Sequence, residues 1–180
     1  MQEIEIKAIL KDRAGVMARL AELDCVFSDP VHQEDRLYVE QVGTIEAFLT
    51  NKVFLRVRVN NGCEVIFTAK TRKGDLVAME REVKVASREQ MEQILLLMGF
   101  QRFNVVRKVR QTTHYNGCEI CIDEVEGLGS FIEMEKLSVD GNPQEIQEEL
   151  FTFFETLGIA RSDRVTKGYD ILMFEKQQVG

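Results

Sequence analysis

Seven segments of this 180-residue chain alternate between charged and apolar residues, and this alternation constrains the fold most strongly. Period-two alternation predicts β-strands whose side chains divide between a buried face and a polar face. The first segment, "EIEIKA", sets Glu3, Glu5 and Lys7 against Ile4 and Ile6. The other polar faces carry Arg56 and Arg58; Thr68, Lys70 and Arg72; Glu80, Glu82 and Lys84; Lys108 and Arg110; Glu119 and Asp123; and Glu133 and Glu135.

Helices are predicted between and after these strands. Asp12 is the expected N-cap of a first helix, and Ser87 with Gln90 resembles a capping box that opens a second, which Gly99 ends. Pro143 opens a third, whose apolar face carries Ile146, Leu150, Phe153 and Phe154. "GYDILMFEK" predicts a short C-terminal helix, "NNG" and "NG" predict hairpin turns, and "GTIEAFLTNK" predicts an irregular connection with a turn of helix.

The helices must bury their apolar faces against the sheet. If they pack against its outside, the charged faces point inward, and the sheet becomes a barrel with a charged interior. Unpartnered charges would be prohibitively costly there. A polyanion with divalent cations would satisfy both kinds of charge, because Lys and Arg bind phosphate oxygens while carboxylates hold Mg²⁺ or Mn²⁺. Alternatively, the charged faces meet water, where cross-strand Glu/Lys pairs are stable. Alternation leaves both arrangements open.

The composition indicates one soluble domain spanning residues 1–180. No apolar run approaches the ~20 residues of a membrane span, and the acidic, strand-like N-terminus does not resemble a signal peptide. The net charge of −7 argues against nonspecific binding to nucleic acid, which needs a basic surface. We therefore expect a cytoplasmic protein with no nucleic-acid or membrane partner.

The cysteine pair C-x-x-C, Cys118 and Cys121, is compatible with half of a zinc site or with a redox motif. No second pair or nearby histidine completes a set of four ligands. In a strand, these two side chains would point to opposite faces. A structural role is therefore the favoured interpretation.

The ordered set of motifs resembles the CYTH superfamily, the triphosphate tunnel enzymes. "EIEIK" matches its E-x-E-x-K signature, "FLRVRV" its L-R-x-R strand, "FTAK" its T-x-K strand and "RKVRQ" its K-x-R strand. "IDEVEGLGSFIEMEKL" resembles its acidic strand, glycine turn and closing E-x-E, and "GYDILMFEK" its C-terminal Y-x-D-L-L. The resemblance covers nearly the whole chain. It implies an α+β fold, a closed antiparallel eight-stranded barrel or tunnel with a charged interior and helices outside.

The resemblance also implies roles for individual residues. The metal ligands or their supports would be Glu3, Glu5, Asp123, Glu133 and Glu135, with Mg²⁺ or Mn²⁺ as cofactor. The phosphate contacts would be Lys7, Arg56, Arg58, Lys70, Lys108 and Arg110. Lys7, Glu5 and Asp123 are the candidate catalytic residues, with Lys7 or a metal-bound hydroxide as base. Glu80 and Glu82 match an E-x-E strand of the family and would support metal binding, although Ala78 stands where that strand commonly begins with Arg.

Length and compactness look closest to the class IV adenylyl cyclase group, and "QEDRLYV" loosely resembles its Q-x-D-x-Y-F stretch. The expected activity is conversion of ATP to cyclic AMP and pyrophosphate. The first alternative is hydrolysis of thiamine triphosphate or inorganic tripolyphosphate, and a second is a noncatalytic module that binds polyphosphate or nucleotide. The group also implies a possible homodimer.

Overall fold

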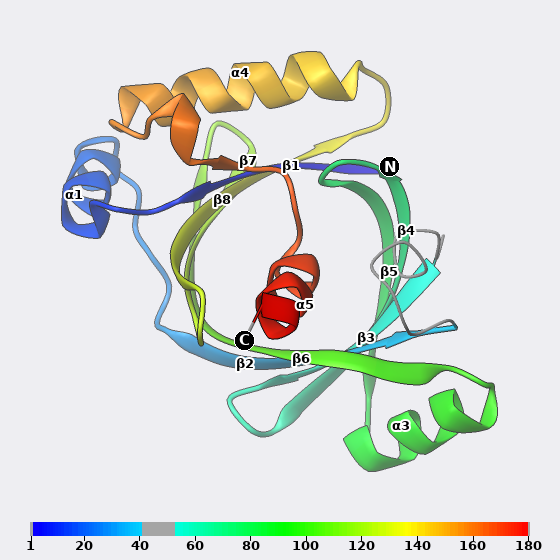
Figure 1. Cartoon of the computed structure of the whole chain (residues 1–180). Coiled ribbons are helices and arrows are strands. Elements are labelled where there is room, and N and C mark those ends of the chain that lie inside the picture. The colour runs from blue at the N-terminus through cyan, green and yellow to red at the C-terminus, as the bar shows by residue number, and fades with distance from the viewer. Residues whose placement is uncertain (1, 41–52, 180) are drawn as a thin grey trace.

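Eight antiparallel strands close into a barrel, as the resemblance predicts (Figure 1). The computed structural model describes residues 2–40 and 53–179. The expected connection at residues 43–52 lies outside the described residues. The barrel strands are β1 (Gln2–Ile9), β2 (Val31–Val39), β3 (Val53–Asn60), β4 (Glu64–Gly74), β5 (Val77–Val85), β6 (Gln101–Tyr115), β7 (Cys118–Val125) and β8 (Gly129–Ser138).

The order around the barrel is β5-β4-β3-β2-β6-β7-β8-β1, and the ring closes where β1 meets β5. The closing pairs are Glu3 with Ala78 and Ile4 with Val77. A two-residue strand, β9 (Arg164–Val165), continues along the same edge of β1. Closure leaves each barrel strand with an inner and an outer face, so the alternation in sequence becomes a division between lumen and exterior.

Local turn chemistry sets the hairpins that the barrel needs. Asn116 and Gly117 join β6 to β7 with φ values of 49° and 75°. A two-residue turn of type I′ requires positive φ at both positions, which asparagine and glycine tolerate best. Between β3 and β4, Asn61 and Gly62 also have positive φ values of 48° and 73°, in a three-residue connection that ends with Cys63. Both predicted hairpin turns are therefore confirmed.

Three helices pack outside the barrel (Figure 1). They are α1 (Arg13–Glu22), α3 (Arg88–Leu97) and α4 (Pro143–Thr156). The expected caps are present, because Asp12 accepts from the Gly15 amide at 2.9 Å and Ser87 from the Gln90 amide at 3.2 Å. Asn142 caps the helix that begins at Pro143. The predicted starts of all three helices are thus explained by local hydrogen bonds.

Two apolar cores anchor these helices to the wall of the barrel. The larger lies under α1 and α4 and contains Leu20, Ile120, Ile132, Phe151 and Phe154. The smaller lies under α3 and contains Tyr38, Leu55, Val57 and Leu95. Because the outer faces of the strands are occupied in this way, the charged faces are left to the lumen.

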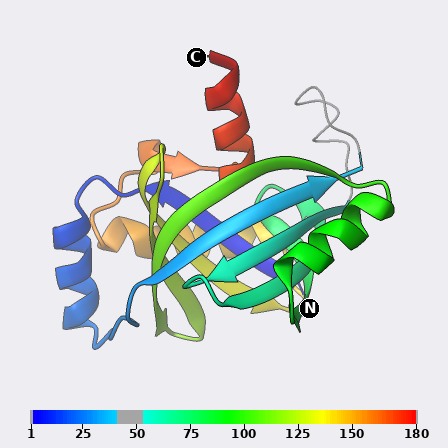
Figure 2. The same ribbon diagram turned by 90° about the horizontal axis from the view of Figure 1, so that it is seen from below.

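The fourth helix, α5 (Tyr169–Val179), stands at one end of the barrel (Figures 1 and 2). Its apolar residues join a third cluster formed by side chains of the barrel, including Leu37, Phe54, Val106 and Phe131. The helix therefore closes part of that end of the lumen. None of the helices in the described parts of the chain is long and apolar enough to cross a membrane.

Replacing Phe154 by alanine is expected to lower the free energy of unfolding by about 3–5 kcal/mol. The ring is fully buried between α4 and the wall, and it lies 5.8 Å from the ring of Phe151, centroid to centroid. Chemical denaturation monitored by circular dichroism measures the change. The control is Thr152→Ala on the exposed face of α4, expected to cost about 0.5 kcal/mol or less. Similar costs for both variants would contradict the assignment of this core.

Candidate functional site

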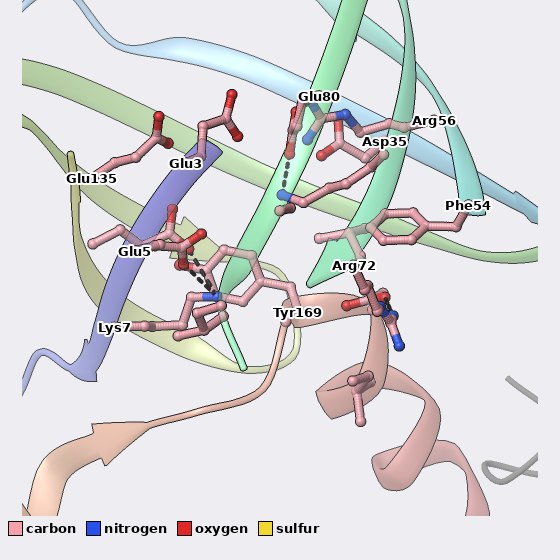
Figure 3. A pocket seen from close by; sticks show the side chains of 18 of the residues that line it. Glu3, Glu5, Lys7, Asp35, Phe54, Arg56, Arg72, Glu80, Glu135 and Tyr169 are labelled. Carbon is pink, nitrogen blue, oxygen red and sulfur yellow. Dashed lines mark hydrogen bonds and ion pairs between the residues drawn. The ribbon is translucent and has the colours of Figure 1, made fainter. Parts of the chain in front are cut away.

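The lumen of the barrel holds a cavity of about 520 Å³ that is lined mainly by charged side chains (Figure 3). All of the predicted site residues except Asp123 line it: Glu3, Glu5, Lys7, Arg56, Arg58, Lys70, Glu80, Glu82, Lys108, Arg110, Glu133 and Glu135. They come from six different strands, because each strand contributes its inner face. The charged faces of the strands therefore point into the lumen. This is one of the two arrangements that the alternation alone left open.

Lys7 lies at the centre of a buried ion cluster. Its ammonium lies 3.0 Å from Glu133 and 3.1 Å from Glu5, and the side chain is almost inaccessible. Burial opposes the charge of Lys7, but these two carboxylates outweigh that effect and raise its pKa above the ordinary value. Lys7 thus stays a cation, which suits contact with phosphate better than acceptance of a proton.

Asp123 organises a second cluster just behind the wall of the cavity. It is 0% exposed and accepts from Arg110 Nε at 2.7 Å, and its other oxygen lies 3.2 Å from the Lys108 ammonium. Arg110 also reaches Glu133, which links the two clusters. Burial would raise the pKa of Asp123, but Lys108 and Arg110 lower it. Asp123 is therefore ionised and holds two of the predicted phosphate-binding cations in place.

A third group of charges lies across the lumen on β3, β4 and β5. Arg56 contacts Glu80 at 3.3 Å and Glu82 at 2.9 Å, and it donates to the Thr68 hydroxyl at 3.2 Å. Lys70 pairs with Glu80 as well. Burial opposes ionisation of Glu80, but Lys70 and Arg56 lower its pKa. These cations therefore face the lumen with their charges already balanced by neighbouring carboxylates.

Glu3 and Glu135 differ from the other carboxylates of the predicted site, because neither has a cation within ion-pair distance among the described residues (Figure 3). Burial, together with Glu80 and Glu135, raises the pKa of Glu3 to about 8. Burial, together with Glu5 and Glu119, raises the pKa of Glu135 to about 7. Adjacent carboxylates that resist ionisation mark a surplus of negative charge, which a hard divalent cation would neutralise.

The donor set therefore fits Mg²⁺ or Mn²⁺ by its chemistry. Within the described ranges, however, no three His, Cys, Asp or Glu side chains converge into a ready-made metal site. Mg²⁺ commonly binds through one or two protein carboxylates together with water and substrate phosphates. Glu3, Glu5 and Glu135 all line the cavity, so they are the carboxylates that would be available to such a shared site.

The unusual pKa values predict that the metal-free protein loses stability as pH rises. Protonated Glu3 and Glu135 favour the folded state, so their contribution is complete below the ordinary pKa of 4.5 and disappears as pH passes about 7 and about 8. The Tm measured in EDTA should therefore fall as the pH rises from about 4.5 to about 8 and level off above that. Glu3→Gln should flatten this fall, whereas exposed Glu22→Gln should not. Added Mn²⁺ should raise the Tm most at the alkaline end. A Tm that is independent of pH would contradict this account.

Sequence reasoning missed two functional side chains. Asp35 accepts from Arg58 at 2.6 Å and 2.8 Å, but its strand carries polar residues on both faces, so alternation does not single it out. Tyr169 donates its hydroxyl to Asp123 at 3.0 Å, although it belongs to a helix at the far end of the sequence. The sequence pointed to these two residues only through the resemblance of "QEDRLYV" and "GYDILMFEK" to family motifs. That resemblance assigned no role to Asp35 or Tyr169.

The C-x-x-C pair lies on β7 as the strand interpretation predicts. Cys118 joins the core under α1 and α4, whereas Cys121 contacts Glu119, one of the residues that line the cavity. The two thiols therefore point to opposite faces of the strand.

Comparison with known proteins places this architecture in a family. The model of the CYTH domain matches residues 1–169. A protein of Methanocaldococcus jannaschii, named "Putative adenylate cyclase MJ0240", is 33% identical over 173 residues, covering 94% of this chain and 97% of that protein. The structure of the PH1819 protein from Pyrococcus horikoshii superposes with a TM-score of 0.80 and 29% identity, covering 97% of this chain and 99% of that one.

The fold is also shared with HpAC1 from Hippeastrum, at a TM-score of 0.59 and 19% identity over 93% of this chain and 91% of that one. HpAC1 is described as a candidate adenylyl cyclase with a dominant triphosphatase activity. The match to the CYTH domain spans nearly all of the chain and agrees with the closed barrel and its charged lumen. The chain belongs to the CYTH domain family.

Proposed function

We propose that this protein is a metal-dependent enzyme that acts on a triphosphate, most specifically an adenylyl cyclase that converts ATP to cyclic AMP and pyrophosphate. The observation that carries the proposal is the lumen itself, in which the six predicted phosphate-binding cations and a set of carboxylates face one cavity. The cations are Lys7, Arg56, Arg58, Lys70, Lys108 and Arg110. A module that only binds polyphosphate needs the cations but gains nothing from so many acids.

Each side of the lumen has a separate task in this proposal. Lys108 and Arg110, held by Asp123, would bind phosphate oxygens from one side, and Arg56 and Lys70 from the other. Lys7 stays charged and would contact phosphate as well. Glu3, Glu5 and Glu135 would hold the cation, with Glu133, Glu80 and Glu82 in support. A bound divalent cation would neutralise charge on the transferring phosphorus and lower the pKa of the attacking hydroxyl.

In the cyclase reaction, the ribose 3′-oxygen forms a bond to the α-phosphorus. The bond from that phosphorus to the bridging oxygen breaks, pyrophosphate leaves, and the hydroxyl proton passes to a base or to solvent. The name of the Methanocaldococcus relative and its 33% identity support this choice. The lumen orients the triphosphate, and the orientation decides which phosphorus is attacked.

The alternative function is hydrolysis, in which water attacks the terminal phosphorus of thiamine triphosphate or inorganic tripolyphosphate. The dominant triphosphatase activity described for HpAC1 favours keeping this candidate. The same cations and carboxylates serve either reaction, because in both an oxygen nucleophile attacks a phosphorus of a triphosphate and a phosphate-containing group leaves.

Product analysis separates these functions. Purified protein is incubated with ATP and either Mg²⁺ or Mn²⁺, and nucleotides, phosphate and pyrophosphate are quantified. Cyclic AMP with an equal amount of pyrophosphate supports the cyclase. ADP with phosphate, or inert ATP beside rapid hydrolysis of tripolyphosphate or thiamine triphosphate, supports the hydrolase. No turnover of any of these compounds would contradict the proposed enzyme and leave only binding.

A further inference from the structure

Tyr169, the first residue of α5, reaches from the end of the barrel into the ion clusters of the lumen (Figure 3). Its side chain is buried, and its hydroxyl donates to Asp123 Oδ2 at 3.0 Å. The ammonium of Lys7 lies 4.1 Å from the centroid of its ring, and that of Lys108 lies 5.0 Å away. One aromatic side chain thus contacts three charged residues that come from three different strands.

These contacts constrain the charges in two distinct ways. The hydroxyl supplies Asp123 with a neutral donor beside its bonds to Lys108 and Arg110, which fixes the orientation of the carboxylate. The ring presents its electron-rich face to two ammonium groups, which attracts both toward one point. Without the ring, Lys7 would be held by Glu5, Glu133 and a longer hydrogen bond of 3.4 Å to the Lys167 carbonyl, and the two carboxylates would compete with a bound phosphate for the same charge.

Several contacts hold Tyr169 in this position. Its ring packs edge-on against Phe131 at 5.1 Å between centroids. The next residue, Asp170, pairs with Arg72 at 2.9 Å, and its carbonyl accepts from Asn104 at 2.7 Å. The start of α5 is therefore attached to the inner wall of the barrel through both its side chains and its backbone.

We propose that Tyr169 is a positioning residue for the triphosphate site, which holds Lys7 and Lys108 through its ring and orients Asp123 through its hydroxyl. The inference rests on the proposed function, because it assigns to the C-terminal helix a part in binding the triphosphate. It extends the site beyond the strands that carry the charged alternation.

Two substitutions separate the two contacts. Tyr169→Phe removes the hydroxyl and keeps the ring, so kcat should fall by about 10-fold while KM for the triphosphate stays nearly constant. Tyr169→Leu also removes the ring, so KM should rise by about 10-fold in addition. Binding of inorganic tripolyphosphate in EDTA, measured by titration calorimetry, should weaken for Tyr169→Leu and stay at the wild-type level for Tyr169→Phe.

The matched control is Phe174→Leu in the same helix. Phe174 stacks on Phe103 at 4.9 Å between centroids, and within the described part of the chain its ring makes no cation–π contact with Lys7 or Lys108. This variant should lower the Tm but change kcat and KM by no more than about twofold. It therefore measures the effect of loosening α5 alone.

The possible failures are distinguishable. A wild-type protein that neither binds tripolyphosphate nor turns over any triphosphate would overturn the proposed function and this inference with it. Wild-type activity that is unchanged in both Tyr169 variants would overturn the inference alone. The same result follows if Phe174→Leu reproduces their kinetic losses, because Tyr169 would then act only through the docking of the helix.

Discussion

Replacing Glu133 by glutamine is expected to lower metal-dependent kcat by at least about 10²-fold while metal-free binding of tripolyphosphate is kept. Glu133 is buried and pairs with both Lys7 and Arg110, so it joins the two central clusters. Burial would raise its pKa, but Lys7 and Arg110 hold that pKa well below the ordinary value, which keeps the carboxylate charged. The neutral amide no longer pairs with the charges of Lys7 and Arg110, so both remain available to phosphate, but it lacks the negative charge that we propose supports the metal.

The experiment measures kcat with Mn²⁺ and, separately, tripolyphosphate binding in EDTA by titration calorimetry. Loss of the buried pairs should also reduce stability by about 3 kcal/mol, so the Tm is recorded for each variant. Glu124→Gln is the matched control, because Glu124 lies on neighbouring β7 but is exposed and contacts Ser130 outside the lumen. Equal loss of binding and turnover in Glu133→Gln would count against a role in holding the metal.

Replacing Arg110 by lysine is expected to raise KM for the triphosphate by about 10²-fold, even though the charge is conserved. The planar guanidinium binds Asp123 through two nitrogens and reaches Glu133 as well. Lysine offers a single point charge, so it cannot keep both carboxylates in place and still present a fixed donor to the lumen. Steady-state kinetics over a range of substrate concentrations measure the change.

Arg107→Lys provides the control for this substitution. Arg107 lies three residues away on the same strand, but it is half exposed and pairs with Glu34 outside the barrel at 2.8 Å. Surface pairs of this kind contribute about 1 kcal/mol or less, so kinetics and Tm should stay near the wild-type values. An equal loss of activity in both lysine variants would show that the effect does not depend on the contacts of Arg110 in the lumen.

Much of the fold was predictable because it is determined locally. The turns at Asn61–Gly62 and Asn116–Gly117 need residues that tolerate positive φ, and these are visible in the sequence. The helix starts at Asp12 and Ser87 are likewise set by side chains within three residues of the amides that they cap. Interactions over such short separations leave a readable pattern.

Asp35 and Tyr169 were not predictable in the same way. Asp35 lies on β2 between Glu34 and Arg36, and those neighbours make their own ion pair outside the barrel. Because β2 has polar residues on both faces, its sequence does not show which face points into the lumen. Tyr169 is separated from Asp123 by 46 residues and comes from a helix, where strand alternation does not apply. Contacts between distant elements of different periodicity have no signature in one sequence.

The sequence by itself determined that charged side chains gather on one face of each alternating segment. The tertiary structure alone decided which way that face points. The helices α1, α3 and α4 cover the outer faces, and closure of β1 onto β5 leaves the charges no route to bulk water except through the lumen. Burial of apolar side chains is the larger driving force, so it determines which face of each strand points outward, toward the helices. The charged side chains are then left in the lumen, where they form ion pairs with one another.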